Sequence, residues 1–135
     1  MGYLKNELSK KSRYYLSRDR YLELKHFCLQ YDEWRSRLLE INDISAKDLV
    51  MAGSDRITNE TERIALERMA LKNKIDLVER TAMDADKSLW YYILKGVTED
   101  RTYIYLVNMM NIPCGKNMYY DRYRKFFWLL DKKRD

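Results

Sequence analysis

The residues best suited to chemistry lie in one basic segment near the end of the chain, from residue 116 to residue 133. Asn and basic side chains on the first turns of a helix can hydrogen-bond to base edges in the major groove of DNA. Asn117 has the chemistry to pair with an adenine edge, and Lys116 or Arg124 with a guanine edge or a phosphate. The predicted DNA-binding residues, several of them placed for flanking phosphates, are Lys116, Asn117, Tyr120, Arg122, Arg124 and Lys125.

A helix over residues 116–133 would position these side chains. At 100° per residue, one side of this helix is an apolar stripe made of Tyr119, Tyr123, Phe126, Phe127 and Leu130. We expect the stripe to pack on Ile104, Leu106 and Val107 of the preceding helix. The opposite side carries Asn117, Asp121, Arg124, Lys125 and Trp128. The alternative is an amphipathic C-terminal helix of an ordinary helical domain, which would show the same two sides.

A short turn precedes this helix. Residues 111–115 contain a proline, which removes a backbone donor and restricts the residue before it. The helix before the turn is expected to be short, with Thr98 as its cap and with Glu99 and Asp100 in its first turn. Helix, turn and basic aromatic helix together predict a helix-turn-helix, although this turn is a residue or two longer than the standard one.

The rest of the chain also has helical spacing. With one proline, four glycines and no strand-like alternation, it predicts an all-α protein. We expect helices over 18–41, 59–83 and 87–96, the last ending at Gly96 and capped by Asp84 or Asp86. Residues 42–57 are expected to form a linker with room for one helical turn. The predicted fold is a long helical hairpin or coiled-coil-like arm, followed by a C-terminal helix-turn-helix. Its parts are an N-terminal helical region with linker, 1–57, and a long helix with the DNA-binding head, 58–135.

The long helix carries a partial coiled-coil seam. Apolar residues recur every seven positions, with two more at intervening positions: Ile57, Ile64, Leu71, Val78 and Ala85, then Ile75 and Ala82. Two packings fit this pattern. The seam either packs on helix 18–41 as a hairpin or joins two chains in a homodimer.

Positive charge is concentrated at the two ends of the chain, whose net charge is +5. Residues 1–25 and 111–135 each hold seven Lys and Arg against three Asp and Glu, whereas residues 26–110 hold twelve against fifteen. This distribution fits two ends that meet a polyanion and a centre that is structural.

Several classes of protein are disfavoured. The sequence has no phosphate-binding glycine loop, no HExxH and no nucleophile elbow, so no enzyme and no cofactor is predicted. Cys28 and Cys114 are far apart, which indicates a reducing compartment rather than a disulfide scaffold, and no metal site is expected. There is no membrane-spanning run and no secretory signal, so we expect a cytoplasmic protein.

The layout resembles small prophage-encoded proteins of Gram-positive bacteria, in particular the ArpU/RinA type of phage late-gene transcriptional regulators. The residues that carry the resemblance are SDRITNETERIALER (54–68), VTEDRTYIYL (97–106) and IPCGKNMYYDRYRKFFWLL (112–130). Members of that type place a coiled-coil-like region before a helix-turn-helix akin to region 4 of sigma factors. The resemblance implies a transcriptional regulator that binds double-stranded DNA as a homodimer, with RNA polymerase or another protein as a further partner.

Two other functions remain open. Twelve Tyr and three Trp are many for 135 residues, and aromatic residues are favoured at interfaces, so the chain could be a helical adaptor or inhibitor of another protein. A small DNA-packaging subunit would also use a helix-turn-helix.

Overall fold

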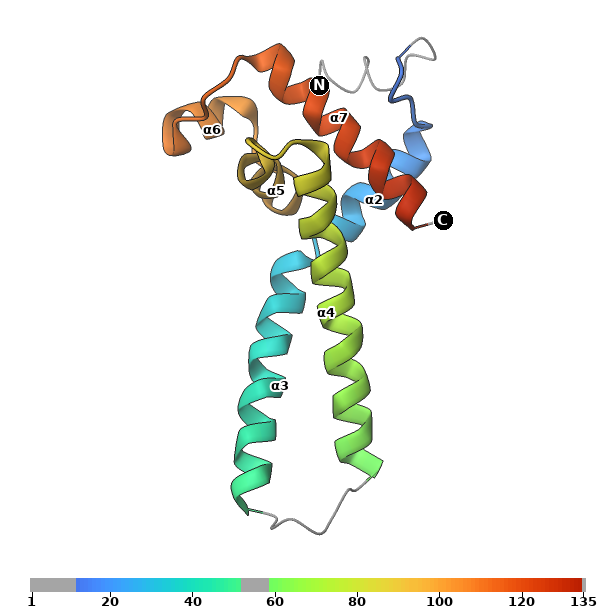
Figure 1. Ribbon diagram of the computed structural model, residues 1–135, viewed down its shortest axis with the longest axis vertical. Helices are drawn as coiled ribbons and strands as arrows, with labels where there is room; N and C mark the ends of the chain where they lie inside the picture. Colours follow the sequence, from blue (N-terminus) through green and yellow to red (C-terminus); the bar gives the residue numbers. More distant parts are fainter. Residues whose placement is uncertain (1–11, 52–58, 135) are drawn as a thin grey trace. The chain divides into compact units, whose positions relative to one another are not determined.

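The computed structural model of the chain describes residues 12–51 and 59–134, without the side chains of residues 45–51. The described part is all-helical and contains no strand, which confirms the predicted fold class. Its helices are α2 (Arg18–Cys28), α3 (Tyr31–Met51), α4 (Asn59–Ala85), α5 (Trp90–Glu99), α6 (Tyr103–Met110) and α7 (Lys116–Lys133) (Figure 1). No described helix combines the length and the apolar character needed to cross a membrane.

The chain forms two compact units, which are described separately. Of the described residues, unit 1 consists of 12–30 and 77–134, and unit 2 of 31–51 and 59–76. Unit 1 therefore contains α2 and the C-terminal helices, and α4 contributes residues to each unit.

The single helix predicted over 18–41 is two helices, so this prediction is wrong. Helix α2 ends at Cys28, where the N–H groups of Leu29 and Gln30 donate to the carbonyls of Lys25 and Phe27. Helix α3 then begins at Tyr31 and continues to Met51. The predicted linker at 42–57 is also wrong for residues 42–51, which are helical, while residues 52–58 lie outside the described part. Neither Pro nor Gly marks the break, and apolar spacing continues through it.

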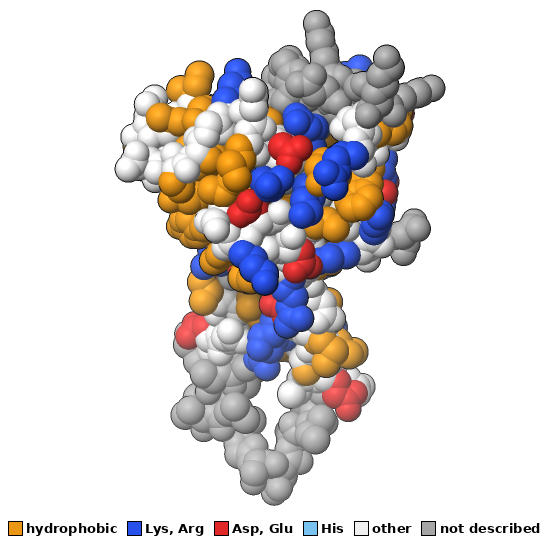
Figure 2. All heavy atoms as spheres, turned by 45° about the horizontal axis from the view of Figure 1, so that its top comes forward, with side chains coloured by type: hydrophobic (Ala, Val, Ile, Leu, Met, Phe, Trp, Pro, Cys, Tyr) orange, Lys and Arg blue, Asp and Glu red, His pale blue; other side chains and the backbone are white. Residues whose placement is uncertain are grey.

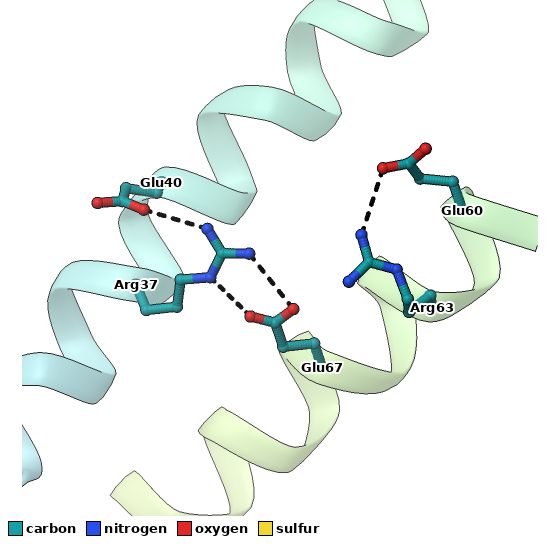
Figure 3. Close-up of polar contacts among 5 residues, drawn as sticks. All are labelled: Arg37, Glu40, Glu60, Arg63 and Glu67. Atoms are coloured by element: carbon teal, nitrogen blue, oxygen red, sulfur yellow. Dashed lines mark hydrogen bonds and ion pairs between the residues drawn. The ribbon is translucent and has the colours of Figure 1, made fainter.

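Unit 2 is a hairpin of α3 and the first part of α4. The guanidinium of Arg37 on α3 donates to both carboxylate oxygens of Glu67 on α4, at 2.6 and 3.4 Å (Figure 3). The ammonium of Lys74 lies 5.7 Å from the centre of the Trp34 ring. Arg37 also pairs with Glu40 within α3, and Arg63 pairs with Glu60 within α4 (Figure 3).

Most of the described part of the heptad seam of α4 is buried within one chain. Leu71 and Ile75 are buried in unit 2, and Val78, Ala82 and Ala85 are buried in unit 1. Ile64 is half-buried, and Ile57 lies outside the described residues. Burial of the five residues from Leu71 onward favours the intramolecular alternative for that part of the seam.

Unit 1 has an aromatic core. Helix α7 packs on α2 and α5, and α5 also packs on α2 and α6. The predicted stripe of α7 is confirmed as core: Tyr119, Tyr123, Phe126, Phe127 and Leu130 are all buried. The hydroxyls of Tyr21 on α2 and Tyr123 on α7 lie 2.9 Å apart and share a hydrogen bond, so the two helices are joined by a polar contact inside the core.

The connection from α5 to α6 differs from the prediction. Helix α5 continues through Gly96 to Glu99 and is closed by Asp100, which has the left-handed φ of 54°. Thr98 caps nothing, because it is buried inside α5 and its hydroxyl donates to the carbonyl of Leu94. The cap of α6 is Thr102, whose hydroxyl accepts from the N–H of Tyr105. Glu99 and Asp100 therefore end one helix and do not begin the next.

The predicted cap of this helix by Asp84 or Asp86 is wrong, because α5 begins after Leu89 and no side chain caps it. The carboxylate of Asp86 instead accepts from the backbone N–H groups of Ser88 and Leu89 and so holds the turn that precedes α5. Asp84, the other candidate, is paired with Lys133 at the surface.

Candidate nucleic-acid interface

The turn between α6 and α7 is held at both of its ends. Asn111 closes α6 with a left-handed φ of 53°, and the N–H of Ile112 donates to the carbonyl of Leu106. A hydrogen bond of this span, made by an apolar residue just after the left-handed position, defines a Schellman motif. Ile112 is that apolar residue, and its side chain is buried. At the other end, the hydroxyl of Tyr103 donates to the carbonyl of Cys114 at 2.6 Å. The turn is thus tied to α6 on both sides despite its length.

Helix α6 meets α7 mainly through its beginning. The N–H of Tyr103 donates to the hydroxyl of Tyr120, and the rings of Tyr103 and Tyr119 lie 6.0 Å apart. Of the three apolar residues expected under the stripe, only Leu106 is buried. Ile104 and Val107 are exposed, so that part of the predicted packing is wrong: the stripe of α7 instead faces α2 and α5.

The first turn of α7 is accessible. Gly115 is its N-cap, so no side chain caps the helix, and Lys116, Asn117 and Met118 are exposed. The predicted bounds of this helix, residues 116–133, are confirmed. In a helix-turn-helix, this end of the second helix is the part that reads base edges.

Two of the six predicted site residues are engaged inside the protein. Arg122 donates to the carboxylate of Asp86 at 3.0 Å and pairs with its neighbour Asp121. The hydrogen bond to Asp86 raises the pKa of the Arg122 guanidinium further. The hydroxyl of Tyr120 accepts from α6, and its ring packs against Tyr119 and Tyr123. Arg122 and Tyr120 therefore help to place α7 in the fold.

The remaining basic residues of the predicted site have no acidic partner. Within the described part of the chain, no ion pair involves Lys116, Arg124 or Lys125. Arg124 and Lys125 are half-buried and Lys116 is exposed. A cation that no carboxylate neutralises can pair with a phosphate without first breaking an internal ion pair.

The N-terminal segment adds a basic residue that the sequence did not point to. The ring of Tyr14 lies 5.5 Å from that of Trp128 on α7, which explains why Trp128 lies away from the core stripe. The guanidinium of Arg13 lies 4.9 Å from the centre of the Tyr14 ring and is exposed. The ammonium of Lys132 also lies over the Trp128 ring, 3.4 Å from its centre. No local signal links Arg13 with α7, because the contact spans most of the chain.

The charge of the chain is distributed unequally between the two units. Residues 12–30 and 77–134 of unit 1 hold fifteen Lys and Arg against nine Asp and Glu, whereas residues 31–76 hold eight against ten. Figure 2 shows Lys and Arg side chains spread over the face in view, from its top down its centre, with hydrophobic and a few acidic side chains among them. The described residues of the two basic ends of the sequence thus belong to one unit.

Other kinds of site find no support among the described residues. No group of three or more His, Cys, Asp or Glu is placed to hold a metal ion there. Burial raises the pKa of the Cys28 thiol far above its usual range, and burial together with Asp86 raises that of Cys114. Both cysteines are therefore protonated thiols at neutral pH and poor nucleophiles.

Comparison of the chain with protein-family models, with curated proteins and with solved structures found no match.

Proposed function

We propose that unit 1 binds double-stranded DNA and that the first turn of α7 is the part that enters the major groove. The observation that carries this proposal is that the described basic residues from both ends of the sequence, 12–30 and 111–134, lie in one unit, where α7 packs on α2 and Trp128 packs on Tyr14. A phosphate backbone is the polyanion that a basic, largely unpaired surface of this kind fits.

The roles of the residues follow from their exposure and pairing. Lys116, Arg124 and Lys125 on α7 would contact phosphates, with Arg13 added from the N-terminal segment. Asn117 is exposed on the first turn and would contact a base edge. Arg122 would act indirectly, because its ion pair with Asp86 connects α7 to the corner before α5.

A role in transcription is proposed on the resemblance to phage late-gene regulators alone. RNA polymerase or another protein would then be a further partner.

Binding to a labelled DNA duplex of mixed sequence is expected to weaken steeply with salt. Four phosphate contacts predict a slope of about −3.6 in a plot of log association constant against log salt concentration. Affinity would then fall roughly a hundredfold between about 50 and 200 mM salt. Fluorescence anisotropy at several salt concentrations measures this slope.

Substitutions test whether DNA binding depends on the proposed interface or only on the overall positive charge of the chain. Lys116→Ala and Arg124→Ala should each lower the magnitude of the slope by about 0.9. Lys72→Ala, an exposed position on α4 in unit 2, removes the same charge and should leave the slope unchanged. Absence of binding by the unaltered protein, or a slope near zero, would exclude the proposal.

Asn117→Ala is expected to change the choice of sequence rather than the salt dependence. A lost bidentate contact to adenine costs about 1–3 kcal/mol of discrimination at one base pair. Selection from a random duplex pool, with the unaltered protein and the variant in parallel, would show one position losing its preference. Identical selected sequences would remove Asn117 from the proposed readout.

A further inference from the structure

A stack of two rings and two cations joins the segment before α2 to the last turns of α7. The rings of Tyr14 and Trp128 lie 5.5 Å apart at an angle of 59°, and Tyr14 is only 5% exposed. The guanidinium of Arg13 lies 4.9 Å from the centre of the Tyr14 ring. The ammonium of Lys132 lies on the Trp128 ring. The segment before α2 is thus fixed on α7 by one of its aromatic side chains.

Local hydrogen bonds keep Arg13 in a short turn. The N–H of Tyr14 donates to the hydroxyl of Ser12, and the N–H of Tyr15 donates to the carbonyl of Ser12. The next serine, Ser17, caps α2. Arg13 itself is exposed, and it forms no ion pair within the described part of the chain. An unpaired guanidinium therefore projects from a turn whose two ends are held.

The stack lies on the side of α7 that is proposed to face DNA. At 100° per residue, Trp128 lies within about 40° of both Asn117 and Arg124 around the helix axis. Along the axis, Trp128 lies about 17 Å from Asn117, whereas the major groove is only about 12 Å wide. With the first turn of α7 in the groove, the stack therefore lies at the level of the phosphate backbone that borders it.

We propose that Tyr14 and Trp128 are positioning residues, which hold Arg13 against the phosphate backbone of bound DNA. This inference rests on the DNA-binding proposal, in which Arg13 is one of four phosphate contacts. A long side chain on an unfixed segment loses conformational entropy when it pairs with a phosphate, and one that is already held over a ring loses less. Arginine suits this position because its planar group stacks on an aromatic face and donates to phosphate oxygens from its edge.

Trp128→Ala tests this inference, because it removes a ring and no charge. The magnitude of the salt slope should fall from about 3.6 to about 2.7, the same loss that Arg13→Ala should cause. Trp128→Phe keeps a ring for Tyr14 to pack on and should restore most of the slope. Trp90→Ala is the matched control, because Trp90 is also half-buried in unit 1 but its ring packs on Tyr91 of its own helix. This control should leave the slope unchanged.

A double substitution separates positioning from a purely structural role. In the Arg13→Ala background, Trp128→Ala should cause no further loss of slope or affinity, because the contact that Trp128 positions is already absent. Tyr14→Ala should repeat both results from the other ring, with circular dichroism confirming that each variant remains helical.

The outcomes distinguish this inference from the DNA-binding proposal. An equal loss of affinity on Trp128→Ala with and without Arg13 would show that the ring only stabilises α7 and would overturn the inference. An unchanged slope in Trp128→Ala, measured beside an unaltered protein that binds with the expected slope, would overturn this inference alone. Absence of DNA binding by the unaltered protein would overturn both.

Discussion

Gly96→Ala is expected to destabilise unit 1, although Ala is the better helix former. A methyl group on Gly96 would lie 2.0 Å from the hydroxyl oxygen of Tyr119, whose side chain is fully buried. Overpacking of this kind costs about 1–3 kcal/mol and occasionally more. The gain in helix propensity is only about 1 kcal/mol. The midpoint of thermal unfolding should therefore be roughly 2–8 °C lower than that of the unaltered protein.

The Tyr119→Phe background provides the decisive comparison. Without the hydroxyl, the nearest ring atom lies 3.4 Å from the added methyl, which is close to ordinary van der Waals contact. In that background Gly96→Ala should be neutral or stabilising by up to about 1 kcal/mol. Gly115→Ala is the control, because its added methyl meets nothing within 4 Å, and it should cost less than about 1 kcal/mol. Equal destabilisation in both backgrounds would show that the Tyr119 hydroxyl is not the obstacle.

The same glycine shows where sequence reasoning reached its limit. Gly96 was predicted to end a helix, because glycine is common just after a helix C-terminus. In the structure Gly96 lies inside α5, where its missing side chain leaves room for the hydroxyl of Tyr119. Tyr119 comes from a distant part of the chain, so no local pattern reveals this contact. The left-handed residue that does close α5 is Asp100, a residue type that tolerates this conformation.

Helix α7 was predicted well because its signals are local. Pro113 and Gly115 mark its beginning, and apolar side chains at helical spacing define its buried side. The break between α2 and α3 had no such signal. Its apolar residues serve two different units, and periodicity alone does not distinguish a long helix from two shorter ones.

The candidate site was predicted in part, for a related reason. Residue type and helix side identified the basic positions of α7 but not which of them were already paired. Arg122 differs from Arg124 because Asp86, 36 residues earlier in the chain, lies beside it. Arg13 joins the surface through Tyr14 and Trp128, a contact between the two ends of the chain.

Asp86→Asn is expected to cost about 1–3 kcal/mol of unfolding free energy at neutral pH. The side chain of Asp86 is only 13% exposed, and it accepts from two backbone N–H groups and from Arg122. The substituted amide can still accept from the backbone, but it carries no charge for Arg122. Asp84→Asn is the matched control, because Asp84 pairs with Lys133 at the surface and is 59% exposed, so its loss should cost less than about 1 kcal/mol.

The cost of Asp86→Asn should depend on pH in a defined direction. Burial raises the pKa of Asp86, but hydrogen bonds from Leu89, Arg122 and Ser88 outweigh burial and hold this pKa below its usual value. A carboxyl group with a lowered folded-state pKa stabilises the fold above its unfolded pKa of about 3.9, and this stabilisation is lost as pH falls through the folded value. Urea unfolding of the protein and of Asp86→Asn should thus give a constant difference above about pH 5 and a shrinking one below about pH 4. Glu67 and Glu99 also have lowered pKa values, but they are present in both proteins and cancel in the difference. If the difference in unfolding free energy stayed unchanged into strong acid, the charge of Asp86 would not be what holds α7 to the turn before α5.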